Sequence, residues 1–343
     1  MNRDLWKKAD WIFLALTLGL ALMGFILSFS TGQGLTDNLV LKTGIYIALG
    51  MLGLFFIASI DYNKYKEIEK PLYFIMILIL VLVLIFGKEI YGAKNWIYIG
   101  PFSIQPSEFS KIFFILVYAN YLTRHYENDG SFKNIFSALL YAVPPLILIL
   151  LEPDMGTTLV FIAIIFGMLF SSTYNKKYLA IIFFGALGII VLWIFLHLTI
   201  GLPIPLDEYQ IQRFTVFLNP YKDGQNGLGA GYNIIQATIA VGSGGLSGKG
   251  FLNGTQVNLL PVKESDFAFS VVGEEFGFIG SLVLIIVFFL FLLKALTIAH
   301  ECLDHYGYLV TIGFISMFLF HIVENIGMNL SLMPVTGIPL PFI

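Results

Sequence analysis

Four carboxylates lie in the stretch PVKESDFAFSVVGEEFGFIG, residues 261–280, at the start of a long apolar run: Glu264, Asp266, Glu274 and Glu275. Acids that a lipid bilayer would enclose are costly to bury, so they are candidates for function. Asp266 directly precedes the run, where partial burial and the neighbouring Glu264 are expected to raise its pKa. Such a carboxylate suits a general base near neutral pH. The structural alternative is that Ser265 or Asp266 caps the following helix.

A second charged pair comes from NWIYIGPFSIQPSEFSKI, residues 95–112. Ser107 suits the N-cap of a helix that has Glu108 in its first turn. Glu108 and Lys111 are three positions apart, so they share one face of that helix. They form either a neutralising ion pair at the membrane boundary or a charged wall of a polar cavity.

Residues 213–250 are rich in glycine, which lets backbone amides approach a phosphate closely. The segment is not a Walker loop, because its spacing differs and Gly250 stands where serine or threonine is needed. One interpretation is a flexible re-entrant loop. The other is that Arg213 and Lys249 meet a lipid-linked pyrophosphate from outside the membrane.

Two further polar groups have structural explanations that we favour. EPDMGTTL, residues 152–159, places two acids on a tight turn, where Asp154 caps the next helix rather than acting in catalysis. Late in the last apolar run, His321, Glu324 and Asn325 either hydrogen-bond between helices or line a cavity, and we favour the first.

The composition predicts a membrane protein. Of the 343 residues, 57% are hydrophobic and 12% are charged, whereas soluble domains carry roughly 25% charged residues. The net charge of −3 gives no indication of nucleic-acid binding. A single cysteine, Cys302, excludes a disulfide framework. The expected fold is therefore an all-α, multi-pass bundle.

About nine apolar runs approach the roughly 20 residues that a spanning helix needs. They are residues 11–29, 39–60, 71–86, 109–124, 137–151, 155–173, 178–200, 267–293 and 306–329. The first run lacks a cleavage site and is expected to remain as a span. The pair Pro144 and Pro145 predicts a kink in the fifth.

Lysine and arginine crowd into the short loops on one side of these runs, which places the N-terminus in the cytoplasm. Two long segments, residues 87–108 and 201–266, then face outward. The second is a large extracellular loop between the seventh and eighth helices. Long ordered loops tend to carry function, so we expect the active site on the outer side.

Five blocks in this order resemble the SEDS family of shape, elongation, division and sporulation proteins, and within it the RodA branch, with FtsW as its sister. The blocks are NWIYIGPFSIQPSEFSKI, EPDMGTTL, RFTVFLNPYKDGQNGLGAGYNIIQATIAVGSGGLSGKG, LLPVKESDFAFSVVGEEFGFIG and NIGMNLSLMPVTGIPLPF. Together they extend over nearly the whole chain. The resemblance implies one integral membrane domain, residues 1–343, from a family with ten transmembrane helices.

The resemblance also implies an activity. SEDS proteins are peptidoglycan glycosyltransferases that polymerise lipid II into glycan strands on the outer face of the bacterial cytoplasmic membrane, here during cell elongation. The implied partners are lipid II, the glycan on undecaprenyl pyrophosphate, membrane lipids and a class B penicillin-binding protein. The family's essential aspartate matches Asp266, and its tryptophan matches Trp96.

The implied reaction inverts the α-linked donor to a β bond, with Asp266 taking the proton of the GlcNAc 4-hydroxyl of the acceptor. The leaving pyrophosphate needs positive charge, and a divalent cation, Mg or Mn, is a possible helper. Candidates for this charge are Arg213, Lys249 and Lys111. Glu108 would hold Lys111, and Trp96 would supply an apolar or sugar-stacking wall.

The chain departs from the family pattern in three places. Asn95 stands where the family has arginine, with a lysine one position earlier. Val262 stands where the family has an acid, and Glu264 either takes that role or raises the pKa of Asp266. The sequence ends at Ile343, where the family continues into a last helix.

Two other functions fit a membrane bundle. A lipid II flippase predicts a polar path across the bilayer, whereas the polar blocks crowd toward the outer side. A non-catalytic scaffold for a class B penicillin-binding protein predicts that Asp266 is dispensable. We favour the glycosyltransferase.

Overall fold

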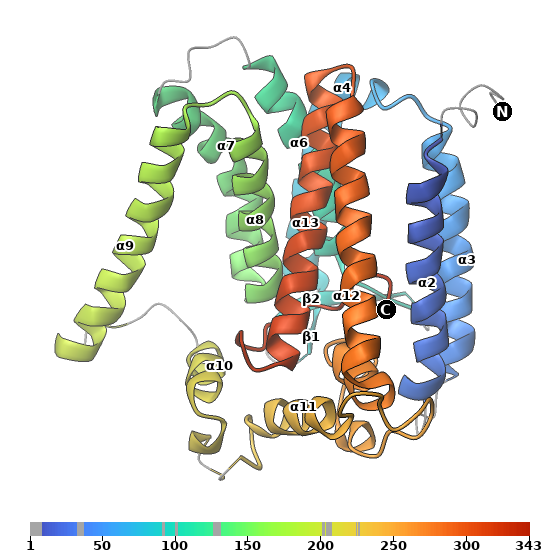
Figure 1. Cartoon of the computed structure of the whole chain (residues 1–343). Helices are drawn as coiled ribbons and strands as arrows, with labels where there is room; N and C mark the ends of the chain where they lie inside the picture. Colours follow the sequence, from blue (N-terminus) through green and yellow to red (C-terminus); the bar gives the residue numbers. More distant parts are fainter. Residues whose placement is uncertain are drawn as a thin grey trace. The chain divides into compact units, whose positions relative to one another are not determined.

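The computed structural model describes residues 9–32, 38–90, 93–99, 102–125, 132–200, 203, 208–223, 225 and 227–343. This part of the chain is mostly helical, with one small sheet (Figure 1). The chain forms two compact units. The first comprises Met1–Lys64, Gln212–Glu301 and Phe318–Ile343, and the second comprises Tyr65–Ile211 and Cys302–Met317.

The first unit is built around three long apolar helices. α2 (Trp11–Thr31) packs against α3 (Leu39–Ala58) and α12 (Ala268–Glu301), and α11 (Tyr232–Ser243) also lies against α12. The later turns of α13 (His305–Asn329) complete the unit.

Aromatic side chains fix the C-terminal segment in this unit. Phe291 of α12 stacks on Phe13 of α2, with 5.0 Å between ring centroids. It also meets Phe318 and Phe342 edge-on at 5.6 and 5.5 Å. Such geometries are favourable beyond the burial of the rings. The residues after α13 are therefore packed onto helices that come from both ends of the chain.

The second unit is built around five consecutive helices and also includes the early turns of α13. α5 (Glu69–Phe86) packs against α6 (Pro106–Arg124) and α7 (Phe132–Leu151), α7 contacts α8 (Met155–Ser171), and α8 contacts α9 (Lys176–Ile200). α7 continues through Pro144 and Pro145. A short helix, α4 (Lys64–Glu67), precedes α5.

The structure also contains a small antiparallel sheet, which was not among the predicted elements. Its three strands, in the order β1 (Lys88–Ile90), β2 (Ala93–Ile99) and β3 (Phe102–Ile104), lie within the first of the two long segments. Trp96 on β2 pairs with Lys88, and Ile97 pairs with Ile104.

The second long segment, residues 201–266, is folded in the ranges that the structure describes. It contains α10 (Glu208–Leu218), the 3-10 turn η1 (Pro220–Lys222), α11 and a second 3-10 turn, η2 (Val257–Leu259). The carboxylate of Asp223 accepts hydrogen bonds from the amides of residues 225, 227, 229 and 231. These bonds hold the pKa of Asp223 down at about 2, chiefly through the amide of residue 227.

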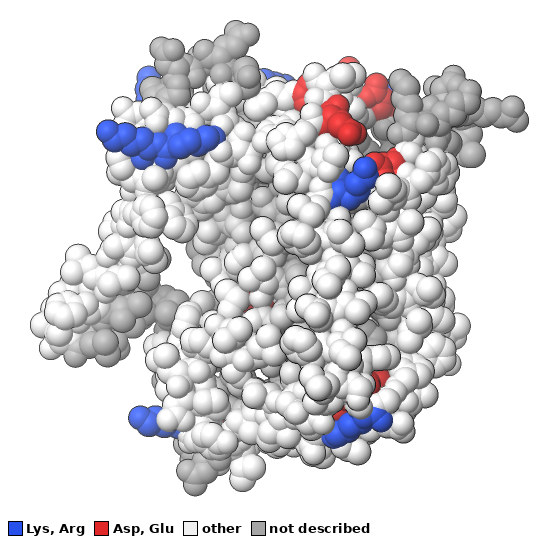
Figure 2. Space-filling model, viewed as in Figure 1, with Lys and Arg blue, Asp and Glu red and all other residues white. Residues whose placement is uncertain are grey.

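Each of the predicted apolar runs corresponds to a helix. Among the described residues, seven helices are long and apolar enough to span a membrane: α2, α3, α5, α7, α9, α12 and α13. α8 is shorter, with 17 residues. On the face shown in Figure 2, the Lys, Arg, Asp and Glu atoms gather at the top and the bottom, and the surface between them is almost entirely uncharged. Large side chains such as Phe56 and Phe86 are exposed, as expected for surfaces in contact with lipid.

α12 is interrupted at Gly277, whose φ of 65° is non-helical. The loop of residues 244–250 supplies the missing backbone partners. The amides of residues 278 and 279 donate to the carbonyls of residues 245 and 246, at 2.9 and 3.1 Å. In return, the amides of residues 249 and 250 donate to the carbonyls of Glu274 and Glu275, both at 2.9 Å. A side chain at Gly248 or Gly277 would overlap this backbone.

Candidate functional site

Asp266 lies in the turn just before α12, and α13 holds its backbone. Its carbonyl accepts hydrogen bonds from Asn325 Nδ2 at 3.0 Å and from Asn329 Nδ2 at 2.9 Å. The amide of Ser270, in the first turn of α12, donates to Asn329 Oδ1 at 3.1 Å. Asn329 therefore accepts the hydrogen bond at the start of α12, where the sequence offered Ser265 or Asp266 as the capping residue. The carboxyl of Asp266 points elsewhere.

Burial raises the pKa of the Asp266 carboxyl, which confirms the direction expected from the sequence. The hydroxyl of Ser265, which donates to Oδ1 at 2.9 Å, opposes this shift, as does the charge of Arg213. The charge of Glu264 adds a smaller upward contribution. A carboxyl of this kind takes a proton more readily than an exposed aspartate.

Arg213 of α10 is the cation of this cluster. Its Nη1 donates to the backbone carbonyl of Thr336 at 3.1 Å. Gly337, the next residue, has a φ of 81°, and a Cβ there would lie 3.5 Å from Asp266 Oδ2. The segment after α13 therefore borders both the candidate base and its nearby guanidinium.

Lys249 pairs with a carboxylate. Its Nζ lies 2.6 Å from Glu274 Oε1 and 3.0 Å from Thr255 Oγ1. Glu274 also accepts from the amides of residues 255, 256 and 257. Ser30 donates to Glu275 Oε2 at 2.7 Å. Glu274 and Glu275 therefore each have a partner, the first a lysine and the second a serine hydroxyl.

Glu108 and Lys111 form the predicted ion pair in the second unit, 2.6 Å apart, with the lysine side chain 2% and the glutamate 43% exposed. The prediction that Ser107 is the N-cap of α6 is wrong. The helix begins at Pro106, because proline suits the first helical position, and Gln105 occupies the cap.

Asp154 caps α8, as predicted, by accepting from the amide of Thr157 at 2.9 Å. Its Oδ2 also accepts from Asn95 Nδ2 at 3.1 Å and Gln105 Nε2 at 2.9 Å. Asn95, which stands where the resemblance expects arginine, is thus bound to this turn. Because successive side chains of a strand alternate, Trp96 lies on the opposite face of β2.

Glu152, the other acid of this turn, is enclosed in the protein. It is 0% exposed, and neither carboxylate oxygen has a hydrogen-bond partner within the described residues. Burial, followed by the charge of Asp154, raises the pKa of Glu152 to about 9. It therefore stays protonated at neutral pH.

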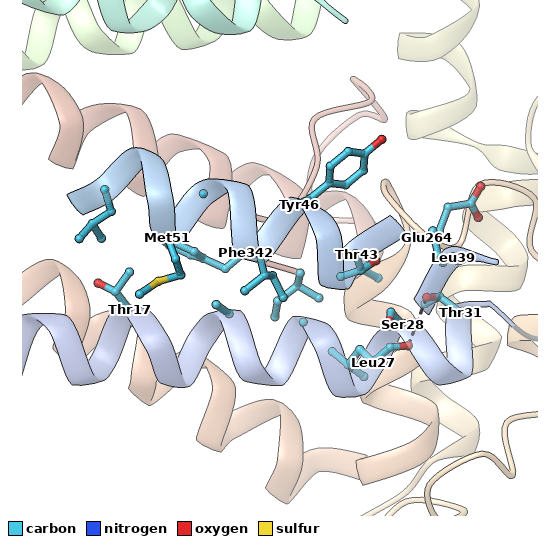
Figure 3. A pocket seen from close by; sticks show the side chains of 17 residues that line it. Thr17, Leu27, Ser28, Thr31, Leu39, Thr43, Tyr46, Met51, Glu264 and Phe342 are labelled. Atoms are coloured by element: carbon cyan, nitrogen blue, oxygen red, sulfur yellow. Dashed lines mark hydrogen bonds between the residues drawn. The ribbon is translucent and has the colours of Figure 1, made fainter. Parts of the chain in front are cut away.

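An apolar cavity of about 550 Å³ lies between α2 and α3 in the first unit (Figure 3). Leu27, Tyr46, Met51 and Phe342 are among its lining residues. Glu264 also lines it. The cavity suits an apolar chain rather than a polar ligand.

The candidate residues fall into separate groups. In the first unit, the charges of Arg213 and Glu264 both act on Asp266, and Lys249 is paired with Glu274. Trp96, Glu108 and Lys111 belong to the second unit. Over the ranges that the structure describes, no three His, Cys, Asp or Glu side chains gather as metal ligands. The Mg or Mn ion remains a prediction, and no step below depends on it.

The sequence analysis did not identify Asn329 as a residue that holds Asp266 and the start of α12. Its signal was available, because Asn325 and Asn329 are one helical turn apart in a largely apolar helix. For Asn325, we favoured hydrogen bonding over the lining of a cavity, and the structure confirms these hydrogen bonds.

Comparison with known proteins gives consistent matches. The family model of the cell cycle proteins FtsW, RodA and SpoVE matches residues 8–343. The peptidoglycan glycosyltransferase RodA of Treponema pallidum is 30% identical, over 96% of this chain and 92% of that protein. Stage V sporulation protein E of Bacillus subtilis is 35% identical, over 97% and 91%. The peptidoglycan glycosyltransferase MrdB of Escherichia coli K12 is 35% identical, over 87% and 78%.

Solved structures agree. A chain of a peptidoglycan synthase complex matches with a TM-score of 0.80 and 27% identity, over 98% of this chain and 91% of that one. The rod shape determining protein RodA of Thermus thermophilus matches with a TM-score of 0.69 and 27% identity, over 98% and 90%.

Proposed function

We propose that this chain, which belongs to the cell cycle protein family of FtsW, RodA and SpoVE, is a peptidoglycan glycosyltransferase that polymerises lipid II with Asp266 as general base. The activity follows from relatives named peptidoglycan glycosyltransferase that align along most of the chain. The observation that carries the role of Asp266 is its half-buried carboxyl of raised pKa, whose backbone α13 holds at the start of α12.

The reaction joins the 4-hydroxyl of a GlcNAc on lipid II to the anomeric carbon of the growing glycan. Asp266 takes the hydroxyl proton as the new glycosidic bond forms on one face of the sugar. The bond to undecaprenyl pyrophosphate breaks on the opposite face, so the configuration inverts. One base on the attacking side is then sufficient.

Arg213 is the residue that we place at the leaving pyrophosphate. Its charge already acts on Asp266, so a guanidinium lies near the proton acceptor. A guanidinium presents several N–H donors in a planar fork that matches phosphate oxygens. Positive charge positioned for the departing group stabilises the transition state. Lys249 is a weaker candidate, because Glu274 already neutralises it.

The apolar cavity between α2 and α3 is a suitable place for a polyprenyl tail. It is lined largely by apolar side chains and includes Glu264, two positions before Asp266 (Figure 3). A tail in this cavity would let the sugar reach the base while the lipid remains in the bilayer.

The chain is a multi-pass membrane protein, for which we propose the bacterial cytoplasmic membrane, a cytoplasmic N-terminus and an active site on the outer face. The charge bias of the loops supports this orientation. We also propose a class B penicillin-binding protein as partner, supported by the match to a peptidoglycan synthase complex. The cellular role would be wall synthesis during elongation and the maintenance of cell shape.

The test is polymerisation of purified lipid II by the protein with its cognate class B penicillin-binding protein. Wild type is compared with Asp266→Asn and with Asp61→Asn, an exposed aspartate outside the cluster. We expect glycan strands from wild type and Asp61→Asn, and none from a folded Asp266→Asn. Polymer from Asp266→Asn would remove this residue from the mechanism. Transport of lipid II across liposomes without polymer from wild type would favour a flippase instead.

A further inference from the structure

Residues 335–339, which follow α13 and which we name the strap, are tied back to that helix. Asn325 Nδ2 donates to the carbonyl of Ile338 at 2.8 Å. Glu324 Oε1 accepts from the hydroxyl of Thr336 at 2.5 Å. Two neighbouring residues of one helix therefore fix the strap at two points.

The strap in turn touches both charged groups of the candidate site. The carbonyl of Thr336 accepts the hydrogen bond from Arg213 Nη1. A Cβ at Gly337 would lie 3.5 Å from Asp266 Oδ2, which is van der Waals contact, so the strap runs alongside the carboxylate. Asn325 also donates to the carbonyl of Asp266, so one amide binds the strap and the candidate base together.

Glu324 is a buried carboxyl at a position where packing alone would favour an apolar side chain. Its side chain is 1% exposed, and its second oxygen, Oε2, has no hydrogen-bond partner among the residues described. A buried carboxyl with one unsatisfied oxygen costs stability, so packing alone does not account for a glutamate at this position. The charges of Asp266 and Arg213 both act on it.

We propose that Glu324 is a positioning residue, which acts through the Thr336 hydroxyl to fix the strap and so to orient Arg213 beside Asp266. The proposal rests on the function proposed above. The bond to Thr336 sets where that residue's carbonyl lies, and the carbonyl sets one N–H of the guanidinium. The guanidinium is thereby held at a fixed place beside Asp266, from which it would meet the pyrophosphate that leaves. Glu324 itself contacts no reacting atom.

The test compares lipid II polymerisation by full-length variants with the partner protein. Thr336→Val removes the hydroxyl and keeps the shape of the side chain, whereas Thr336→Ser keeps the hydroxyl. We expect kcat to fall about tenfold in Thr336→Val, roughly the value of one hydrogen bond, with KM changed less than twofold. Thr336→Ser should stay within about threefold of wild type. Thr297→Val is the matched control, because this exposed threonine donates within α12.

A double-mutant cycle tests the route of action. If Glu324 acts through Thr336, then Glu324→Leu combined with Thr336→Val lowers kcat no further than Glu324→Leu alone. Multiplicative losses in the double variant would overturn this route. Glu324→Gln, which keeps an acceptor for the hydroxyl, should retain more activity than Glu324→Leu.

The outcomes separate this proposal from the proposed function. No polymer from wild type defeats the proposed function itself. Polymer from wild type together with normal kcat in Thr336→Val and Glu324→Leu overturns only the positioning role. Lower melting temperatures with an unchanged kcat per folded molecule would show that Glu324 and Thr336 are purely structural, and would also overturn it. If Glu324→Leu does not fold, the comparison of Thr336→Val with Thr336→Ser decides alone.

Discussion

Asn329 binds the chain on both sides of Phe267: its Nδ2 donates to the carbonyl of Asp266 at 2.9 Å, and its Oδ1 accepts from the amide of Ser270 at 3.1 Å. The hydroxyl of Ser270 donates to the same oxygen at 2.5 Å. One buried amide from α13 thus starts α12 and holds the candidate base.

Replacement of Asn329 should therefore affect both stability and activity. In Asn329→Ala, the carbonyl of Asp266 and the amide of Ser270 lose partners, and each unsatisfied group costs about 1–3 kcal/mol. We expect a lower melting temperature in detergent and at least a tenfold lower polymerisation rate. Asn63→Ala, at an exposed turn, is the control. Unchanged melting and activity in Asn329→Ala would contradict this account of how the turn is held.

The pH dependence of polymerisation should report the surroundings of Asp266, whose pKa is raised chiefly by burial. The base acts when ionised, so activity is lost as the pH falls through its pKa. Glu264→Gln removes a charge that raises this pKa, so the acid limb of kcat/KM should move to lower pH. Ser265→Ala removes a hydrogen bond that lowers it, so the limb should move to higher pH. Shifts in the same direction would exclude Asp266 as the titrating group.

Glu274 should control the order of the segment that follows Lys249. It accepts from three successive amides and from the lysine, and a glutamine carries no charge to strengthen these bonds. In Glu274→Gln, we expect trypsin to cleave after Lys249 several times faster than in wild type. Glu301→Gln, at the other end of α12, should not change the rate. Equal cleavage in both variants would argue against this role.

Glu152 should make folding stability depend on pH. Burial and the charge of Asp154 raise its folded pKa to about 9, from an ordinary value of 4.5. The folded state keeps the proton that the unfolded state releases, so stability falls as the pH rises from about 4.5 and levels off above about 9. Glu152→Gln should remove this dependence and stabilise the protein by about 3 kcal/mol at pH 7.

Thermal melting in detergent between pH 5 and 9 checks this expectation for Glu152. The melting temperature of Glu152→Gln should exceed that of wild type most at the alkaline end and little at pH 5. Glu301→Gln should follow the wild-type curve. A constant difference at all pH values would mean that Glu152 does not hold its proton in the folded state.

The helices and the local contacts could be predicted because their causes are local. Apolar length alone located nine of the helices, although it set their ends to within only a few residues and seven of them qualify as spans among the described residues. The spacing of Glu108 and Lys111 predicted their ion pair, and the position of Asp154 before an apolar run predicted its cap. These contacts join residues three apart, so the helix geometry determines them.

The features that the sequence did not predict depend mostly on contacts between segments that are distant in the chain. The start of α12 is satisfied by Asn329 from another helix, so a capping pattern around Ser265 and Asp266 was misleading. The strap reaches Asp266 only because α13 holds it there. Ser107 was displaced from its expected cap by the backbone preference of Pro106, a local signal that outweighed the side chain.

The interruption of α12 at Gly277 also constrains biosynthesis. The exposed amides and carbonyls at the break pair with residues 244–250, which leave the ribosome before α12 does. Lipid offers no hydrogen bonds, and each unpaired backbone group there costs several kcal/mol. The loop is therefore already available when the broken helix moves sideways from the translocation machinery into the bilayer. A chain with these two segments in the reverse order would have to insert the break before its partners had been translated.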